Sequence, residues 1–391
     1  MSVEVKTPKL NNYLEPKTTI DQMKYLIIFE TFIGINRLYL CGYRKCVLWL
    51  SYTYDVLLLL VTATLVIRYN YVKTFNFSKK VIIVEYLSLG FGALLMRKTS
   101  RKFFSSLQLF DEKLNIGDDA PLLSPKSWYL YGVRAILFYT LSEIIFSVLF
   151  VFFLTHASFE GLIIYLPIIV HDVEMIFYCY LLALIFSRLA LVKAHVAKVF
   201  HMNIKNHPDS KDSETIRELV KRVNLDVSSV HDLYDLLHKC SKRLSCLMSL
   251  SMIAIIITSG LSTISVLKHT ITMIQNIEAY SYPEAIESIA IFSIARTFKL
   301  TLLLTLPCFI TNKTKSEVSI IREIIYDALN RNNQDKIERR KIKAFFQLVC
   351  ENEFEYSFLG VINLNMSLPL SYCSLCTTYL IIVIQFSKFL D

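Results

Sequence analysis

Several ionisable side chains interrupt long apolar stretches of the sequence. Glu143 lies in one such stretch, His171 and Asp172 lie in the next, and Arg296 lies in a third. Because a charge inside a bilayer costs about 3 kcal/mol, such residues usually pair with one another, face a water-filled cavity or bind a ligand. With their polar and aromatic neighbours they form a set of candidate ligand-pocket residues: Tyr139, Ser142, Glu143, Phe146, His171, Asp172, Glu174, Tyr178, Ser293, Arg296 and Thr297.

Two interpretations of this set are open. In the first, an apolar cup with a few convergent polar groups opens outward and holds a small organic ligand. Phe150, Tyr165 and Phe292 are further aromatic side chains that would line such a cup. In the second, the charged members of the set only neutralise one another between helices.

The last apolar stretch, 370–389, contains one amide. Thr378 and Gln385 are seven residues apart and therefore share one face of a helix, and Tyr379 and Phe386 form the adjacent stripe. A single helix in lipid would leave the Gln385 amide poorly satisfied, whereas several copies around an axis would give it water or partner amides. A hydrogen bond from Gln385 to a neighbouring helix is the alternative.

Sequence signatures of catalysis are absent: the chain has no HExxH, GxSxG or Walker A motif. Cys373 and Cys376 have the spacing of a metal-binding pair but lack a second pair. We therefore expect neither an enzyme nor a bound metal or cofactor.

The composition indicates that lipid is the solvent for much of the chain. Of the 391 residues, 54% are apolar and 19% are charged, against about 45–50% and 25% in soluble domains. Gly90 and Gly92 lie within an apolar stretch and favour close helix packing. Seven stretches have the length of a transmembrane helix: 46–67, 81–96, 128–155, 161–190, 246–268, 287–311 and 370–389.

The basic residues are sorted by loop. Of the 42 Lys and Arg residues, 32 lie in the N-terminal segment and after the second, fourth and sixth spans, and 6 lie in the other connections and the C-terminal tail. The positive-inside rule then places the N-terminus in the cytoplasm and the C-terminus outside. The net charge of +9 therefore reflects membrane topology, and we expect no nucleic-acid partner.

Two cytoplasmic segments, 191–245 and 312–355, have the apolar periodicity of helices. We expect spans four, five and six to continue into the cytoplasm and to pack there as a helical anchor bundle. The fold class is thus an all-α membrane protein with seven transmembrane helices. Its expected parts are a cytoplasmic N-terminal segment (1–45), spans one to four (46–190), a cytoplasmic helical extension (191–245), spans five and six (246–311), cytoplasmic anchor helices (312–369) and span seven (370–391).

Residues 378–386, TYLIIVIQF, match at all nine positions the TYhhhhhQF motif of insect gustatory receptors, where h is hydrophobic. The length, the seven spans and the inverted topology also resemble that family. Since no signature of the sugar or carbon dioxide receptor groups is present, the chain is most similar to the divergent set called bitter receptors.

The resemblance implies a homotetrameric or heterotetrameric, ligand-gated, non-selective cation channel with a pore lined by the last span. It implies that Gln385 and Phe386 lie at the gate, that Thr378 and Ile382 lie further along the pore, and that Tyr379 packs behind them. The tastant would enter the outward-facing pocket.

We therefore expect a multi-pass receptor in the plasma membrane of a gustatory neuron, opened by a small plant-derived or dietary compound. An odorant receptor subunit of the same architecture is the first alternative. A G-protein-coupled receptor is the second, although its Asp-Arg-Tyr and Asn-Pro-x-x-Tyr motifs are missing.

Overall fold

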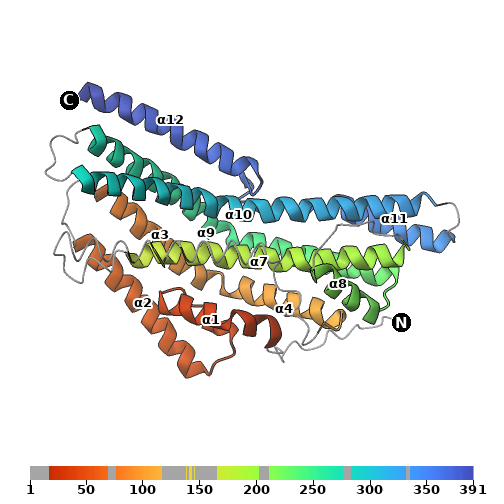
Figure 1. The fold of residues 1–391 in the computed structure, drawn as a ribbon. Helices are drawn as coiled ribbons and strands as arrows, with labels where there is room; N and C mark the ends of the chain where they lie inside the picture. The colour runs from red at the N-terminus through yellow and green to blue at the C-terminus, as the bar shows by residue number, and fades with distance from the viewer. Residues whose placement is uncertain are drawn as a thin grey trace.

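The computed structural model describes residues 17–68, 76–116, 138, 141–142, 145, 165–201, 211–275, 283–331 and 335–390. Long helices run side by side in these ranges (Figure 1). The elements are α1 (Lys17–Phe32), η1 (Leu38–Leu40), α2 (Lys45–Arg68), α3 (Asn76–Leu95), α4 (Arg97–Lys113), α7 (Tyr165–Val199), α8 (Lys211–Arg222), α9 (Val227–Gln275), α10 (Pro283–Leu329), α11 (Lys336–Glu351), β1 (Ser357–Phe358), β2 (Ile362–Asn363) and α12 (Ser367–Leu390).

Six of the seven expected spans coincide with helices, namely α2, α3, α7, α9, α10 and α12. The other expected span, 128–155, lies almost entirely outside the described residues. Among the described residues, three helices contain segments that are, by length and composition, apolar enough to cross a membrane: Lys45–Leu65, Leu166–Val199 and Val227–Lys268. The prediction of an all-α membrane protein is confirmed.

The three longest helices extend beyond the thickness of a bilayer. α7 has 35 residues, α9 has 49 and α10 has 47. At 1.5 Å per residue each exceeds about 50 Å, whereas a hydrocarbon core measures about 30 Å. The prediction that these spans continue as helices into an anchor bundle is confirmed, and α8 and α11 pack beside the extensions (Figure 1).

Aromatic side chains form the core of the anchor bundle. The Tyr234 ring lies edge-on to Phe345 and Phe354, with centroids 6.0 and 5.5 Å away. His238, one turn further along α9, packs on Phe354, and burial lowers the pKa of its imidazole below the ordinary value. The Tyr234 hydroxyl donates to the Asn352 carbonyl oxygen (3.0 Å), so these contacts join α9 to the end of α11.

A short antiparallel hairpin, β1–β2, interrupts the segment that we expected to be entirely helical. Ser357 pairs with Asn363 and Phe358 pairs with Ile362, and the turn uses the left-handed residues Leu359 and Gly360. Two-residue strands are too short to produce a readable alternation pattern in the sequence. The hairpin packs on α9 through the fully buried Phe358 and leads directly into α12.

The N-terminal segment is also more structured than expected. Ile20, Met23 and Ile27 of α1 recur every three or four residues and are buried, and α1 contacts α7. This short apolar stripe was not recognised in the sequence because many of the residues in 1–45 are polar.

α7 lies at the centre of the helical assembly. In its apolar segment 94% of the residues are buried, against 22% in that of α2. A helix that is apolar all round is expected to be enclosed by others, and α7 contacts α1, α3, α8, α9 and α10.

The small residue Gly90 allows α3 to pack closely on α2. A Cβ added to Gly90 would lie 2.8 Å from the Leu59 side chain of α2.

We predict that Arg188 of α7 is essential for stability, because it donates from Nε and Nη2 to the Asp111 carboxylate of α4 at 2.8 and 2.6 Å in a buried site. Arg188→Ala removes the main partner of this buried carboxylate, which costs about 3–5 kcal/mol. We expect the apparent melting temperature of the detergent-purified protein to fall by about 5–10 °C. Lys239→Ala breaks the exposed pair with Asp235, and this control should stay within about 1 °C. Equal shifts for both variants would contradict the prediction.

Candidate functional site

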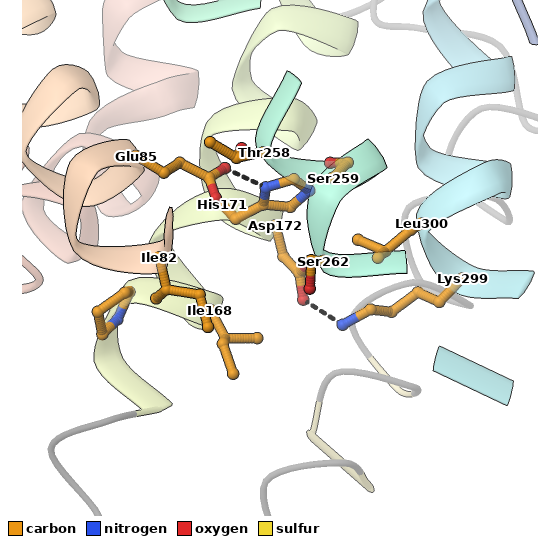
Figure 2. A pocket seen from close by; sticks show the side chains of 11 residues that line it. Ile82, Glu85, Ile168, His171, Asp172, Thr258, Ser259, Ser262, Lys299 and Leu300 are labelled. Atoms are coloured by element: carbon orange, nitrogen blue, oxygen red, sulfur yellow. Dashed lines mark hydrogen bonds and ion pairs between the residues drawn. The ribbon is translucent and has the colours of Figure 1, made fainter. Parts of the chain in front are cut away.

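A small cavity lies between α3, α7, α9 and α10 (Figure 2). About 370 Å³ of space lies between its lining side chains when the open solvent at the mouth is counted, and the interior itself has room for about one or two water molecules. Its polar lining faces apolar side chains from α3, α7 and α10. The lining residues are Ile82, Glu85, Pro167, Ile168, His171, Asp172, Thr258, Ser259, Ser262, Lys299 and Leu300.

Two buried ion pairs form one wall of this cavity. His171 Nδ1 lies 2.5 Å from Glu85 Oε1 of α3, and Lys299 Nζ of α10 donates to Asp172 Oδ2 at 2.8 Å. Because consecutive helical residues point about 100° apart, the neighbours His171 and Asp172 reach two different helices (Figure 2). The pairs therefore fix the rotation of α7 relative to both α3 and α10.

Hydroxyl groups of α9 also line the cavity, beside His171 and Asp172 (Figure 2). Thr258, Ser259 and Ser262 lie within about one turn of one another and are largely buried. The Thr258 hydroxyl donates to the Ala254 carbonyl oxygen at 2.8 Å. Paired charges beside hydroxyl groups give a site that can hydrogen-bond a small polar molecule.

The described residues contain no group of three or more His, Cys, Asp or Glu side chains that would hold a metal ion. Cys373 is exposed and Cys376 is buried on α12, so the two thiols face different surroundings.

The structure divides the charged candidates on α7 between two places. His171 and Asp172 line the cavity, whereas Glu174 receives two hydrogen bonds from the Arg37 guanidinium at 2.6 and 2.9 Å. Arg37 also donates to Glu30 at 2.8 Å. Its guanidinium carbon lies 5.9 Å from the centre of the Tyr178 ring, so Glu174 and Tyr178 serve the junction with the N-terminal segment.

Two of the remaining pocket candidates, Ser142 and Thr297, do not line this cavity. Ser142 is exposed, and Thr297 is half-buried on α10 outside the cavity lining. The other candidates lie outside the described residues or have side chains outside them: Tyr139, Glu143, Phe146, Ser293 and Arg296.

Sequence reasoning missed Glu85, Lys299 and Arg37 as partners of the α7 charges. Glu85 is the one acidic residue of 81–96, and Lys299 is one of two basic residues of 287–311. Matching opposite charges between spans would have suggested these pairs, although sequence alone does not say which spans are neighbours.

The candidate pore residues lie on the exposed side of α12. Thr378, Ile382 and Gln385 are exposed, and the Phe386 side chain is outside the described residues. α12 contacts the rest of the chain through the face that carries Tyr372 and Cys376, and it lies at the outer edge of the helices in Figure 1.

Comparisons with known proteins agree with this architecture. A family model described as 7tm chemosensory receptor matches residues 23–389. Two solved structures of the insect olfactory receptor OR5 from Machilis hrabei are similar: one is in complex with eugenol (TM-score 0.60, 10% identity), and the other is a second structure of the same receptor (TM-score 0.59, 12% identity). Each alignment covers 94% of this chain and 98% of the other. No curated protein matches the chain.

We predict that the Asp172–Lys299 pair is coupled energetically. Asp172→Asn or Lys299→Gln alone leaves a buried charge with its main partner removed. Each single variant should lower the level of receptor at the cell surface at least about threefold. The double variant should recover most of it, because no unbalanced charge remains.

Surface biotinylation measures the amount of receptor at the cell surface for the wild type, the two single variants and the double variant. Lys315→Gln, which breaks the exposed pair with Glu355, is the control and should leave the surface level unchanged. A double variant with the summed losses of the two single variants would refute the coupling.

Proposed function

The chain belongs to the 7tm chemosensory receptor family, and from that membership we propose that it is a ligand-gated, non-selective cation channel and, more finely, a gustatory receptor. The proposed stimulus is a small plant-derived or dietary compound. The proposed setting is the plasma membrane of a gustatory neuron.

The observation that carries the gustatory assignment is the TYhhhhhQF motif at residues 378–386 of α12. Its polar members Thr378 and Gln385 are exposed in the single chain. An exposed amide in a membrane helix is poorly satisfied by lipid, so this face supports assembly around a central axis. We propose a homotetramer, or a heterotetramer with related receptors, in which Thr378, Ile382, Gln385 and Phe386 line the pore and its gate.

The cavity between α3, α7, α9 and α10 is the proposed tastant site. Its buried ion pairs and hydroxyl groups favour a compound with several hydrogen-bonding groups, because an apolar compound would cover these groups without satisfying them. His171 and Asp172 are the two sequence candidates that we retain as contacts, and Glu85, Ser262 and Lys299 join them.

Two helices connect this cavity to α12. Ser262 lines the cavity, and the hydroxyl of the next residue, Thr263, lies 3.0 Å from the Tyr372 hydroxyl of α12. On α10, Leu300 lines the cavity, and Leu304 one turn later packs against Tyr372. A ligand opens a channel only if it binds the open state more tightly than the closed state. We propose that these contacts couple the difference in ligand affinity between the open and closed states to the position of α12.

An odorant receptor subunit is the second candidate, because both similar structures are olfactory receptors. Such a subunit would need a partner to form a channel, so expression alone discriminates: ligand-evoked current without a partner favours the gustatory assignment. A G-protein-coupled receptor gains no support from the family or from the fold.

We predict that Gln385→Ala lowers the single-channel conductance, because the substitution removes the one amide from the proposed pore. Patch-clamp recording in a heterologous cell with G-protein signalling blocked is the measurement, with a panel of plant compounds as stimuli. Gln347→Ala removes an exposed amide from cytoplasmic α11 and should leave the conductance unchanged. Normal conductance in Gln385→Ala would remove this residue from the pore, and loss of all current when G-protein signalling is blocked would refute the channel.

We also predict that Tyr372→Phe weakens the coupling between cavity and pore. The variant keeps the ring and loses one buried hydrogen bond, worth about 1 kcal/mol. The half-activating concentration should rise about fivefold at unchanged single-channel conductance. Tyr326→Phe changes an exposed phenol in the extension of α10, away from the cavity and from α12, and should have no effect, so equal shifts for both variants would contradict this route.

A further inference from the structure

Four basic side chains cluster where α3 passes into α4. Arg97, Lys98, Arg101 and Lys102 occupy the first two turns of α4, directly after the last residues of the second span. No acidic residue lies in the first turn of α4. Within the described part of the chain no carboxylate forms an ion pair with any of the four. We call these residues the Arg97 cluster.

Two tyrosines hold part of this cluster in place. The Arg97 guanidinium carbon lies 5.3 Å from the ring centre of Tyr39 and 5.3 Å from that of Tyr52. The Arg101 guanidinium carbon lies 5.4 Å from the same Tyr39 ring. Tyr39 is in η1 and Tyr52 is in the second turn of α2, so three separate elements meet here. Cation–π contacts position both guanidinium groups without using their N–H donors.

Two buried donors at this junction lack an acceptor among the described residues. They are Arg97 Nε and the Tyr52 hydroxyl. A buried donor without an acceptor costs about 1–3 kcal/mol. Unsatisfied donors beside basic side chains that form no ion pair among the described residues are the features expected of a site for an anion with several acceptor oxygens.

The position of the cluster identifies the source of such an anion. The excess of basic residues after the second span places the Arg97 cluster on the cytoplasmic side. Trp49, one turn into α2, is 72% exposed, as expected for an aromatic side chain at the lipid interface. The cluster therefore lies at the level of the inner-leaflet headgroups, where anionic lipids are concentrated.

We propose that the Arg97 cluster binds the phosphorylated headgroup of an inner-leaflet phosphoinositide. Arg97 and the Tyr52 hydroxyl donate to one phosphate, and Arg101 and the exposed Lys98 and Lys102 neutralise the remaining charge. A headgroup with several phosphates matches four cations within six residues better than a singly charged headgroup does. This site is separate from the cavity and does not depend on which compound opens the channel.

Native mass spectrometry of the full-length receptor in detergent tests the proposal, with phosphatidylinositol bisphosphate, phosphatidylserine and phosphatidylcholine as probes. We expect the bisphosphate lipid to bind most tightly, at one molecule per subunit. Each basic side chain near a membrane surface contributes about fivefold in affinity, so Arg97→Gln/Arg101→Gln should weaken binding about 25-fold. Tyr52→Phe keeps the ring and should weaken binding about threefold to tenfold.

The charge-matched control is Arg339→Gln/Arg340→Gln, which changes two exposed cytoplasmic residues of α11 and should leave lipid binding unchanged. If the Arg97/Arg101 variant does not fold, Tyr52→Phe and the exposed Lys98→Gln/Lys102→Gln variant decide the question by the same measurement. Wild-type affinity in the folded cluster variants, or an equal loss in the control, overturns the proposal. Equally tight binding of soluble inositol trisphosphate also overturns it, because the ligand would then not be a lipid.

Discussion

The arrangement of the other helices depends on neutralising the charges of α7. This helix is apolar and enclosed, so each ionised side chain on it needs a partner from another element, since an unpaired buried charge costs about 3–5 kcal/mol. Each partner comes from a different part of the chain, which fixes both the neighbour and its register. The most deeply buried of these pairs are Glu174 with Arg37, His171 with Glu85, Asp172 with Lys299 and Arg188 with Asp111.

Two of these pairs also make the cavity. Because His171 and Asp172 are adjacent, their partners on α3 and α10 bring a strip of paired charge against the hydroxyl groups of α9. The same helices α9 and α10 then contact Tyr372 of α12. The stability of the fold and the proposed recognition in the cavity therefore both depend on the pairs that join α7 to α3 and α10, and a substitution at the cavity is expected to affect folding as well as response.

The candidate site was partly predictable. His171 and Asp172 could be identified from the free-energy cost of a charged side chain in an apolar span, because such a residue usually pairs with another charge or faces a cavity. The same argument selected Glu174, yet this residue faces Arg37 and not the cavity. A residue's direction follows from helix geometry, but the element that it meets follows from packing. α1 and the β1–β2 hairpin escaped prediction for a related reason, since their few apolar residues become informative only against α7 and α9.

The sequence by itself determined that lipid surrounds much of the chain. It also determined the positions of six described spans, the sidedness of the loops and the cytoplasmic extension of α7, α9 and α10. Hydropathy and charge sorting are local properties of a chain in a bilayer, so they can be read without knowing any neighbour. The tertiary structure alone decided the partners of the buried charges, the place of the cavity and which face of α12 remains exposed. These depend on contacts between residues such as Arg37 and Glu174, which lie 137 positions apart, and such contacts follow from how helices pack and not from local sequence pattern.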